Sequence, residues 1–240
     1  MPYKEISGNI FNSKAQAIVN TVNCVGAMGK GVALDFKLRY PEMFKEYQRI
    51  CSLKLLRPGQ ILPYRKEKPV ILNFAIKDDW KNPSKVEWVE ETLQKFVSHY
   101  QQLGIKSVAF PWMGAMNGGI PVETIKTLMR RYLSSLDDID VEVYDFDPAT
   151  PCHLYKELER VINNHVYSNE ELVSYSRIQD RYWLQIINAM EQNSVTSLNT
   201  LCSFSNNGKS ILGKTNIEKL FLFLTRSEKG EFAEGLYLFQ

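Results

Sequence analysis

The chain has 240 residues, of which 44% are hydrophobic and 23% are charged, and its formal net charge is +2. Such values are typical of an ordinary folded protein with one large domain, or one medium domain with a small appendage, and exclude a disordered chain. A basic bias this weak neither requires nor excludes a nucleic acid as partner.

The cysteines lie at Cys24, Cys51, Cys152 and Cys202. Their spacing fits neither a zinc site nor a disulfide framework, which favours a reducing compartment. The first residues lack the apolar core of a signal peptide, and no apolar run is long enough to cross a bilayer. We therefore expect a cytoplasmic protein with no metal site and no membrane partner.

The first part of the chain shows strand patterns interleaved with helical ones. Apolar runs rich in β-branched residues predict strands at 3–6, 15–22, 61–64, 70–74, 107–111 and 141–146. Apolar residues at helical spacing predict helices over 30–38, from Pro41, from a Ser84 cap to just before Gly104, and from Pro121. This alternation indicates an α/β domain.

The segment 147–151 contains two prolines, and the composition changes beyond it. We place one domain at 1–150 and a second, small and mainly helical, at 151–240. Helices are expected at about 152–164, 177–192 and 216–225, with a short hairpin through Gly230. One predicted helix face carries Tyr182, Trp183, Ile186, Ile187 and Met190, which must pack within this domain or against a partner.

Two glycine-containing stretches each lead from a predicted strand to a predicted helix. The stretch from Asn20 to Ala33 contains three glycines, and a second one runs from Met113 to Pro121. Small residues allow backbone N–H groups to approach an anion, although the spacing is neither the dinucleotide motif nor a Walker loop. An unliganded turn is the alternative. Ligands of α/β sheets bind at the carboxyl ends of strands, so both stretches are expected to face one crevice.

Several motifs, in this order, resemble those of the macrodomain family. They are Gly8-Asn9-Ile10, Ala17 to Asn23, Gly26 to Ala33, and Phe110-Pro111 followed by Gly114 and Gly118-Gly119. The block Asn73 to Lys77, followed by Trp80, is similar to the segment that carries the catalytic lysine in the DarG-like branch. That branch holds DNA ADP-ribosyl glycohydrolase antitoxins and the terminal ADP-ribose glycohydrolase of animals. The resemblance covers residues 3–147 and implies a mixed central sheet flanked by helices.

The resemblance also implies that ADP-ribose is bound between the two glycine stretches. The residues expected to bind it are Asn9, Ile10, Asn20, Gly26, Met28, Gly29, Gly31, Val32, Gly114, Ala115, Met116, Asn117, Gly118 and Gly119. Asn9 replaces the aspartate that usually recognises the adenine amino group, so that contact lacks a charge. Asn20 fits a structural role in the turn as well as a ligand contact. Lys30 is expected to support the loop or face solvent, because backbone amides bind the phosphates.

The resemblance points to Lys77 and Asn23 as the catalytic residues, with Lys77 carrying the chemistry and Asn23 on the hydroxyls of the distal ribose. A lysine there can polarise or protonate the leaving group, or add as an amine to the opened sugar. The alternative is a surface lysine at a strand end, since Asp78 and Asp79 follow it directly. Asp35 can be considered as a base, but a carboxylate in a first helical turn more often serves the helix dipole.

Two more features bear on the substrate. The second stretch has Asn117-Gly118-Gly119 where the animal enzyme carries a catalytic aspartate, which favours DNA over protein glutamate as substrate. Trp80 and Trp112 flank the expected site and can stack a base, although aromatic residues more often belong to a core.

The expected function is removal of ADP-ribose from nucleobases of single-stranded DNA, which reverses a toxin's modification. No cofactor is needed, because ADP-ribose is part of the substrate. By analogy with two-part antitoxins, residues 151–240 are expected to contact a cognate ADP-ribosyltransferase toxin or the DNA. Two alternatives remain: a hydrolase of protein-linked or small ADP-ribose derivatives such as the 1″-phosphate, and a module that binds ADP-ribose without turnover.

Overall fold

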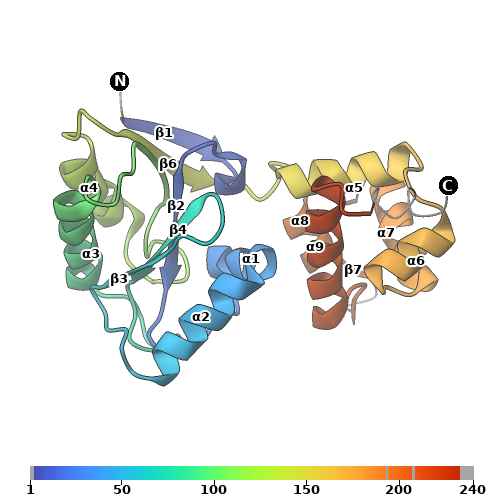
Figure 1. The fold of residues 1–240 in the computed structure, drawn as a ribbon, viewed down its shortest axis with the longest axis horizontal. Helices are drawn as coiled ribbons and strands as arrows, with labels where there is room; N and C mark the ends of the chain where they lie inside the picture. Colours follow the sequence, from blue (N-terminus) through green and yellow to red (C-terminus); the bar gives the residue numbers. More distant parts are fainter. Residues whose placement is uncertain (1–2, 193, 207–208, 233–240) are drawn as a thin grey trace. The chain divides into compact units, whose positions relative to one another are not determined.

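The chain folds into two units, Met1–Phe146 and Asp147–Gln240 (Figure 1). The structure is a computed structural model that describes residues 3–192, 194–206 and 209–232. None of the helices in these ranges is long and apolar enough to span a membrane.

The first unit is built on a mixed six-stranded sheet with the order β1-β6-β5-β2-β4-β3. Its strands are β1 (Tyr3–Gly8), β2 (Ala17–Val22), β3 (Ile61–Tyr64), β4 (Val70–Ala75), β5 (Ser107–Pro111) and β6 (Asp140–Phe146), and a short 3₁₀ helix (Ile10–Asn12) follows β1. The strands β1, β6, β5, β2 and β4 run parallel, and β3 pairs antiparallel with β4. The predicted mixed sheet is confirmed, and five strands end at the same edge.

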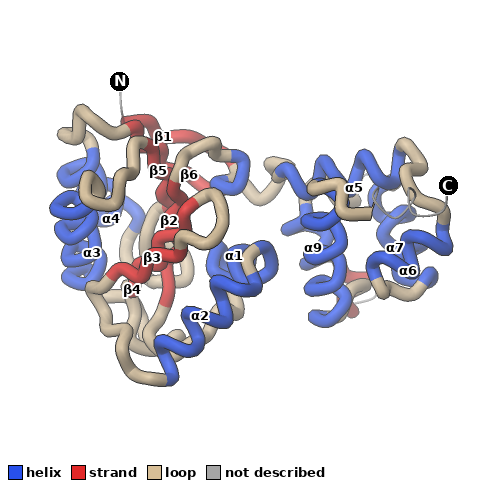
Figure 2. The backbone as a smooth tube through the Cα atoms, in the orientation of Figure 1, coloured by secondary structure: helices blue, strands red, loops and turns tan. Residues whose placement is uncertain are grey.

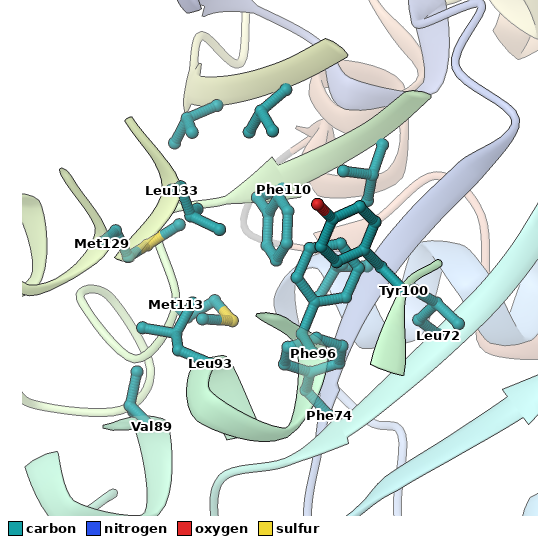
Figure 3. Close-up of a cluster of buried hydrophobic side chains, with 14 of the residues drawn as sticks. Leu72, Phe74, Val89, Leu93, Phe96, Tyr100, Phe110, Met113, Met129 and Leu133 are labelled. Atoms are coloured by element: carbon teal, nitrogen blue, oxygen red, sulfur yellow. The ribbon is translucent and has the colours of Figure 1, made fainter. Parts of the chain in front are cut away.

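Helices cover both faces of this sheet (Figures 1 and 2). They are α1 (Gly31–Arg39), α2 (Pro41–Ser52), α3 (Val86–His99) and α4 (Val122–Leu133). The helices α3 and α4 bury the main core, in which the rings of Phe74, Phe96 and Phe110 meet pairwise at 5.2–6.1 Å (Figure 3). Each of these buried rings contributes about 1.5–3 kcal/mol by leaving water. This packing fixes the strand ends from which the functional loops depart.

The start of α3 differs from the prediction. Lys85 occupies the cap position without a side-chain bond, so the predicted Ser84 cap is wrong. Ser84 is instead buried, and its backbone N–H donates to the carbonyl of Gly118 at 2.8 Å. The residue therefore joins two loops, and the helix begins after it.

The second unit contains five helices in its described part. They are α5 (His153–Asn163), α6 (Asn169–Ser176), α7 (Asp180–Glu191), α8 (Leu198–Ser203) and α9 (Lys214–Glu228), with the short strands β7 (Ser205–Asn206) and β8 (Lys209–Ser210). The helices α6 and α8 were not predicted, although Ser168 and Glu171 form a capping box that marks the start of α6. The hairpin predicted through Gly230 extends into residues that lie outside the described ranges.

The apolar face of α7 packs within the second unit. Trp183 and Ile186 are buried, the indole of Trp183 lies 5.5 Å from the ring of Phe223, and its Nε1 donates to Ser176 Oγ at 3.0 Å. The second unit therefore buries the centre of this face internally, while Tyr182, Ile187 and Met190 are partly buried.

Candidate active site

Three connections leave neighbouring parallel strands at the carboxyl edge of the sheet. Loop 1 (residues 23–30) joins β2 to α1, the lysine segment (residues 76–85) joins β4 to α3, and loop 2 (residues 112–121) joins β5 to α4. Because β5, β2 and β4 are adjacent and parallel, all three connections emerge together. The predicted convergence of the two glycine stretches is therefore present.

Hydrogen bonds tie the lysine segment to both loops. The backbone N–H of Cys24 in loop 1 donates to the carbonyl of Asp78 at 3.0 Å. The Ser84–Gly118 bond ties the other end of the segment to loop 2. The three connections thus form one assembly.

Lys77 adds a side-chain bond between the lysine segment and loop 2. Its Nζ donates to the carbonyl of Asn117 in loop 2 at 2.6 Å, and its side chain is half-buried. Burial lowers the pKa of this amine below its ordinary value, against an opposing effect of Asp78. A lysine in this setting reaches its neutral form at a lower pH than a free lysine, so it can act as a proton donor or as an amine nucleophile.

Two glycines are required by the backbone geometry, Gly118 by a close backbone approach and Gly31 by its positive φ. A Cβ on Gly118 would stand 2.2 Å from the carbonyl oxygen of Gly114, which belongs to the backbone of the same loop. Gly31, the first residue of α1, has a φ of +58°, and a Cβ there would stand 2.5 Å from Nδ2 of Asn117. Loop 2 thus reaches the N-terminus of α1, where backbone N–H groups favour an anion.

The amide of Asn23 is occupied by loop 1 itself. Its Oδ1 accepts from the N–H groups of Val25 at 3.0 Å and Ala27 at 3.2 Å, and from the hydroxyl of Tyr47 at 3.0 Å. Its Nδ2 donates to the carbonyl of Ala27 at 2.6 Å. These contacts make Asn23 a positioning residue of the loop, while the expected contact with the distal ribose stays a prediction.

Asn20 and Asn9 are also engaged inside the protein. Asn20 is fully buried on β2 and donates to Oδ1 of Asn73, its register partner on β4, at 2.8 Å. This contact favours the structural role among the two roles weighed for Asn20. Asn9 is 5% exposed, and its Oδ1 accepts from the N–H of Phe11 at 3.1 Å, which caps the 3₁₀ helix. An adenine contact by Asn9 stays a prediction and must share that oxygen or use the amide nitrogen.

The remaining expected ligand residues divide by exposure. Those whose surface is accessible are Gly29, Gly31, Met116, Asn117 and Gly119. Those that are partly buried are Gly26, Val32 and Ala115, and those that are buried are Ile10, Met28, Gly114 and Gly118. The exposed members lie at the tips of the two loops, where backbone N–H groups can meet a ligand. Lys30 is exposed as well, and it makes no side-chain cap to α1.

Neither Cys24 nor Asp35 offers a simple alternative chemistry. Burial, with smaller contributions of Cys51 and Asp78, raises the pKa of the Cys24 thiol to about 12, so it is not a thiolate near neutral pH. Asp35 lies beyond the first turn of α1, contrary to the expectation, and burial raises the pKa of its carboxyl. Within the described ranges, no three His, Cys, Asp or Glu side chains are grouped to hold a metal ion.

Two residues of the site were missed in the sequence. Tyr47 lies within the helix predicted from Pro41, and its hydroxyl donates to the carbonyl of Asn23 at 2.8 Å. Phe146 ends the strand predicted at 141–146; its side chain is 40% exposed, and its register partner is Gly8, the neighbour of Asn9. An aromatic residue at the carboxyl end of a predicted strand was the available signal for Phe146.

Comparison with known proteins places this site in a family. The model of the macro domain matches residues 19–129. A solved structure, the macrodomain of Thermus aquaticus DarG, is 37% identical with a TM-score of 0.57, over 60% of this chain and 97% of that one. The chain belongs to the macrodomain family. The sequence-based assignment to its DarG-like branch is confirmed.

Two longer relatives contain the same macrodomain. The DNA ADP-ribosyl glycohydrolase of Thermus aquaticus is 38% identical over 144 residues, which is 58% of this chain and 40% of that protein. A transferase–glycohydrolase fusion protein of Thermosipho africanus is 32% identical over 158 residues, again 58% of this chain and 40% of that protein. Its structure, described as DarTG in complex with ADP-ribose, has a TM-score of 0.55. The matched region thus spans less than half of these curated relatives.

Proposed function

We propose that this macrodomain is a glycohydrolase that removes ADP-ribose from nucleobases of single-stranded DNA. The observation that carries the proposal is the position of Lys77, whose Nζ lies 2.6 Å from the carbonyl of Asn117 in loop 2, on a segment that is hydrogen-bonded to both loops. The name of the Thermus aquaticus relative, DNA ADP-ribosyl glycohydrolase, supports DNA as the substrate. A single strand is favoured because enzymes that act on a base need it outside the duplex stack.

ADP-ribose fits the order of features along the carboxyl edge of the sheet. The adenine end lies near Asn9 and the exposed ring of Phe146, which can stack on it. The diphosphate lies over the accessible glycines Gly29 and Gly31 at the N-terminus of α1. The distal ribose then reaches Lys77. The ADP-ribose bound to the Thermosipho africanus relative supports this choice of ligand.

Lys77 acts at the anomeric carbon of the distal ribose in one of two protonation states. The neutral amine, favoured by burial, adds to the opened sugar while the base departs, and water then releases the sugar. The ammonium instead donates a proton to the departing base. Trapping with borohydride separates the two, since only amine addition leaves a reducible imine on Lys77. The substrate moiety is ADP-ribose itself, so no cofactor is proposed.

Substrate choice is tested by incubating the protein with ADP-ribosylated single-stranded DNA, ADP-ribosylated glutamate on protein, and ADP-ribose 1″-phosphate. Release from the DNA is expected. If ADP-ribose is released only from the protein or only from ADP-ribose 1″-phosphate, and not from the DNA, the proposal is contradicted. The alternative hydrolase of protein-linked or small ADP-ribose derivatives is then favoured. Tight ADP-ribose binding without release from any of the three would identify a binding module.

We further propose that the chain acts as an antitoxin toward a DNA ADP-ribosyltransferase in the cytoplasm. The fusion of both activities in the Thermosipho africanus relative supports such a partner. Residues 151–240 are the proposed contact region, and Leu184 on α7 and Leu222 on α9 are exposed there by 50% and 53%. Co-purification of the whole chain with the transferase tests this, and Leu184→Asp should weaken it. Unchanged association of both Leu184→Asp and Leu222→Asp would place the contact elsewhere.

A further inference from the structure

Each of the three connections that meet at the site of Lys77 carries one exposed apolar side chain. Val25 in loop 1 is 51% exposed, Trp80 in the lysine segment is 58% exposed, and Met116 in loop 2 is 74% exposed. Single exposed apolar residues are common on proteins, but their concentration on hydrogen-bonded loops around one site marks a contact surface. Trp80 is the largest of the three and lies three residues after Lys77.

The turn that carries Trp80 is closed by its own hydrogen bonds. Oδ1 of Asp78 accepts from the N–H of Asp79 at 2.7 Å, and Oδ1 of Asp79 accepts from the N–H of Lys81 at 2.9 Å. The N–H of Asn82 donates to the carbonyl of Asp79 at 3.2 Å. The two carboxylates are thereby turned toward their own backbone, and the indole is presented on an ordered turn. An ordered platform loses little entropy when a ligand binds.

A cation accompanies the indole. Nζ of Lys81 lies 5.5 Å from the centroid of the Trp80 ring, and Lys81 takes part in none of the ion pairs found among the described residues. An aromatic face beside a free ammonium matches a nucleotide, because the base stacks on the ring and the cation contacts the phosphate. A nucleotide is favoured over a protein segment as the partner, because an unmodified protein segment does not combine a stacking ring with a phosphate.

We propose that Trp80 and Lys81 bind a nucleotide next to the ADP-ribosylated one, so that the site recognises a strand and not only a modified nucleoside. The proposal rests on the proposed function and adds the part of the substrate outside ADP-ribose. The lysine segment carries three lysines and two aspartates, so stacking contributes more than phosphate contact. The binding of DNA through this surface should therefore depend only weakly on salt.

The test compares kcat/KM for ADP-ribosylated DNA of about ten nucleotides, within the usual site size of single-strand binders, with kcat/KM for the ADP-ribosylated nucleoside. The wild-type protein should prefer the oligonucleotide about tenfold, as expected for one stacked base. Trp80→Ala should lose most of that preference, because its kcat/KM should fall for the oligonucleotide and not for the nucleoside. Trp80→Phe should retain most of the preference. Lys81→Gln should lose about two- to threefold at low salt and less at high salt.

Lys106→Gln is the matched control, because Lys106 is an exposed lysine that precedes β5, at the opposite edge of the sheet. This substitution should leave kcat/KM unchanged for both substrates. Equal wild-type activity on both substrates, or an equal loss on both in Trp80→Ala, would overturn the proposal. Activity on neither substrate would overturn the proposed function and this inference with it.

Discussion

Replacing Asn23 with alanine should lower the free energy of unfolding by about 2–4 kcal/mol. The side-chain amide makes four hydrogen bonds in a partly buried loop, three accepted and one donated. Each such bond contributes about 0.5–1.5 kcal/mol, and the truncation leaves two loop N–H groups and the Tyr47 hydroxyl without this acceptor. Urea denaturation of the wild-type and Asn23→Ala proteins measures the difference.

The same change should weaken ADP-ribose binding about tenfold, because an unsupported loop 1 must then be ordered by the ligand. Calorimetric titration with ADP-ribose measures this effect. Asn82→Ala is the matched control, since its amide makes only two bonds of 3.3 Å to Asp78 in an exposed turn, and it should stay within about 0.5 kcal/mol. Tyr47→Phe should be less than additive with Asn23→Ala, because the two residues share bonds. A loss below about 0.5 kcal/mol in Asn23→Ala would refute the assigned role of this amide.

Three further outcomes follow from the geometry. Gly118→Ala should lower stability by about 1–3 kcal/mol, measured by thermal unfolding, because its Cβ would stand 2.2 Å from a backbone oxygen; an unchanged midpoint would contradict the loop geometry. Phe146→Ala should weaken ADP-ribose binding about tenfold in a titration, while Phe146→Tyr should preserve it. If the two variants bind ADP-ribose with the same affinity, Phe146 does not stack on the adenine. With amine addition by Lys77, the release rate should rise with pH and level off below the ordinary lysine pKa of 10.5, because burial lowers that pKa. A rate that falls over the same range would assign the proton-donor role.

The elements of the first unit could be predicted because each has one strong periodic signal. Buried parallel strands read as short apolar runs, and the glycines between strand and helix mark the loops. The strands predicted at 61–64 and 70–74 are separated by only five residues, and β3 pairs antiparallel with β4. The short helices α6 and α8 carry few apolar residues and were recognisable only by their caps, which the periodic analysis passed over.

The direction of individual side chains was beyond the reach of sequence patterns. An asparagine that contacts a ligand and an asparagine that holds a loop can occupy the same position in a motif. The contacts of Asn23 with Val25 and Ala27 depend on the folded loop and leave no mark in the sequence. The Ser84 prediction failed for the same reason: Ser84 is buried with its backbone N–H bonded to Gly118, and the helix begins one residue later, after Lys85. Exposure separated Trp80, which is open to solvent, from Trp112, which packs against the core.

The most direct test measures release of ADP-ribose from ADP-ribosylated single-stranded DNA by the wild-type and Lys77→Ala proteins. Loss of a group that acts on the reacting bond should slow release by about 10²–10⁴-fold while ADP-ribose binding persists. Lys30→Ala, which removes an exposed lysine from loop 1, should release at the wild-type rate. A Lys77→Ala protein that is as fast as the wild type would contradict the central role given to Lys77.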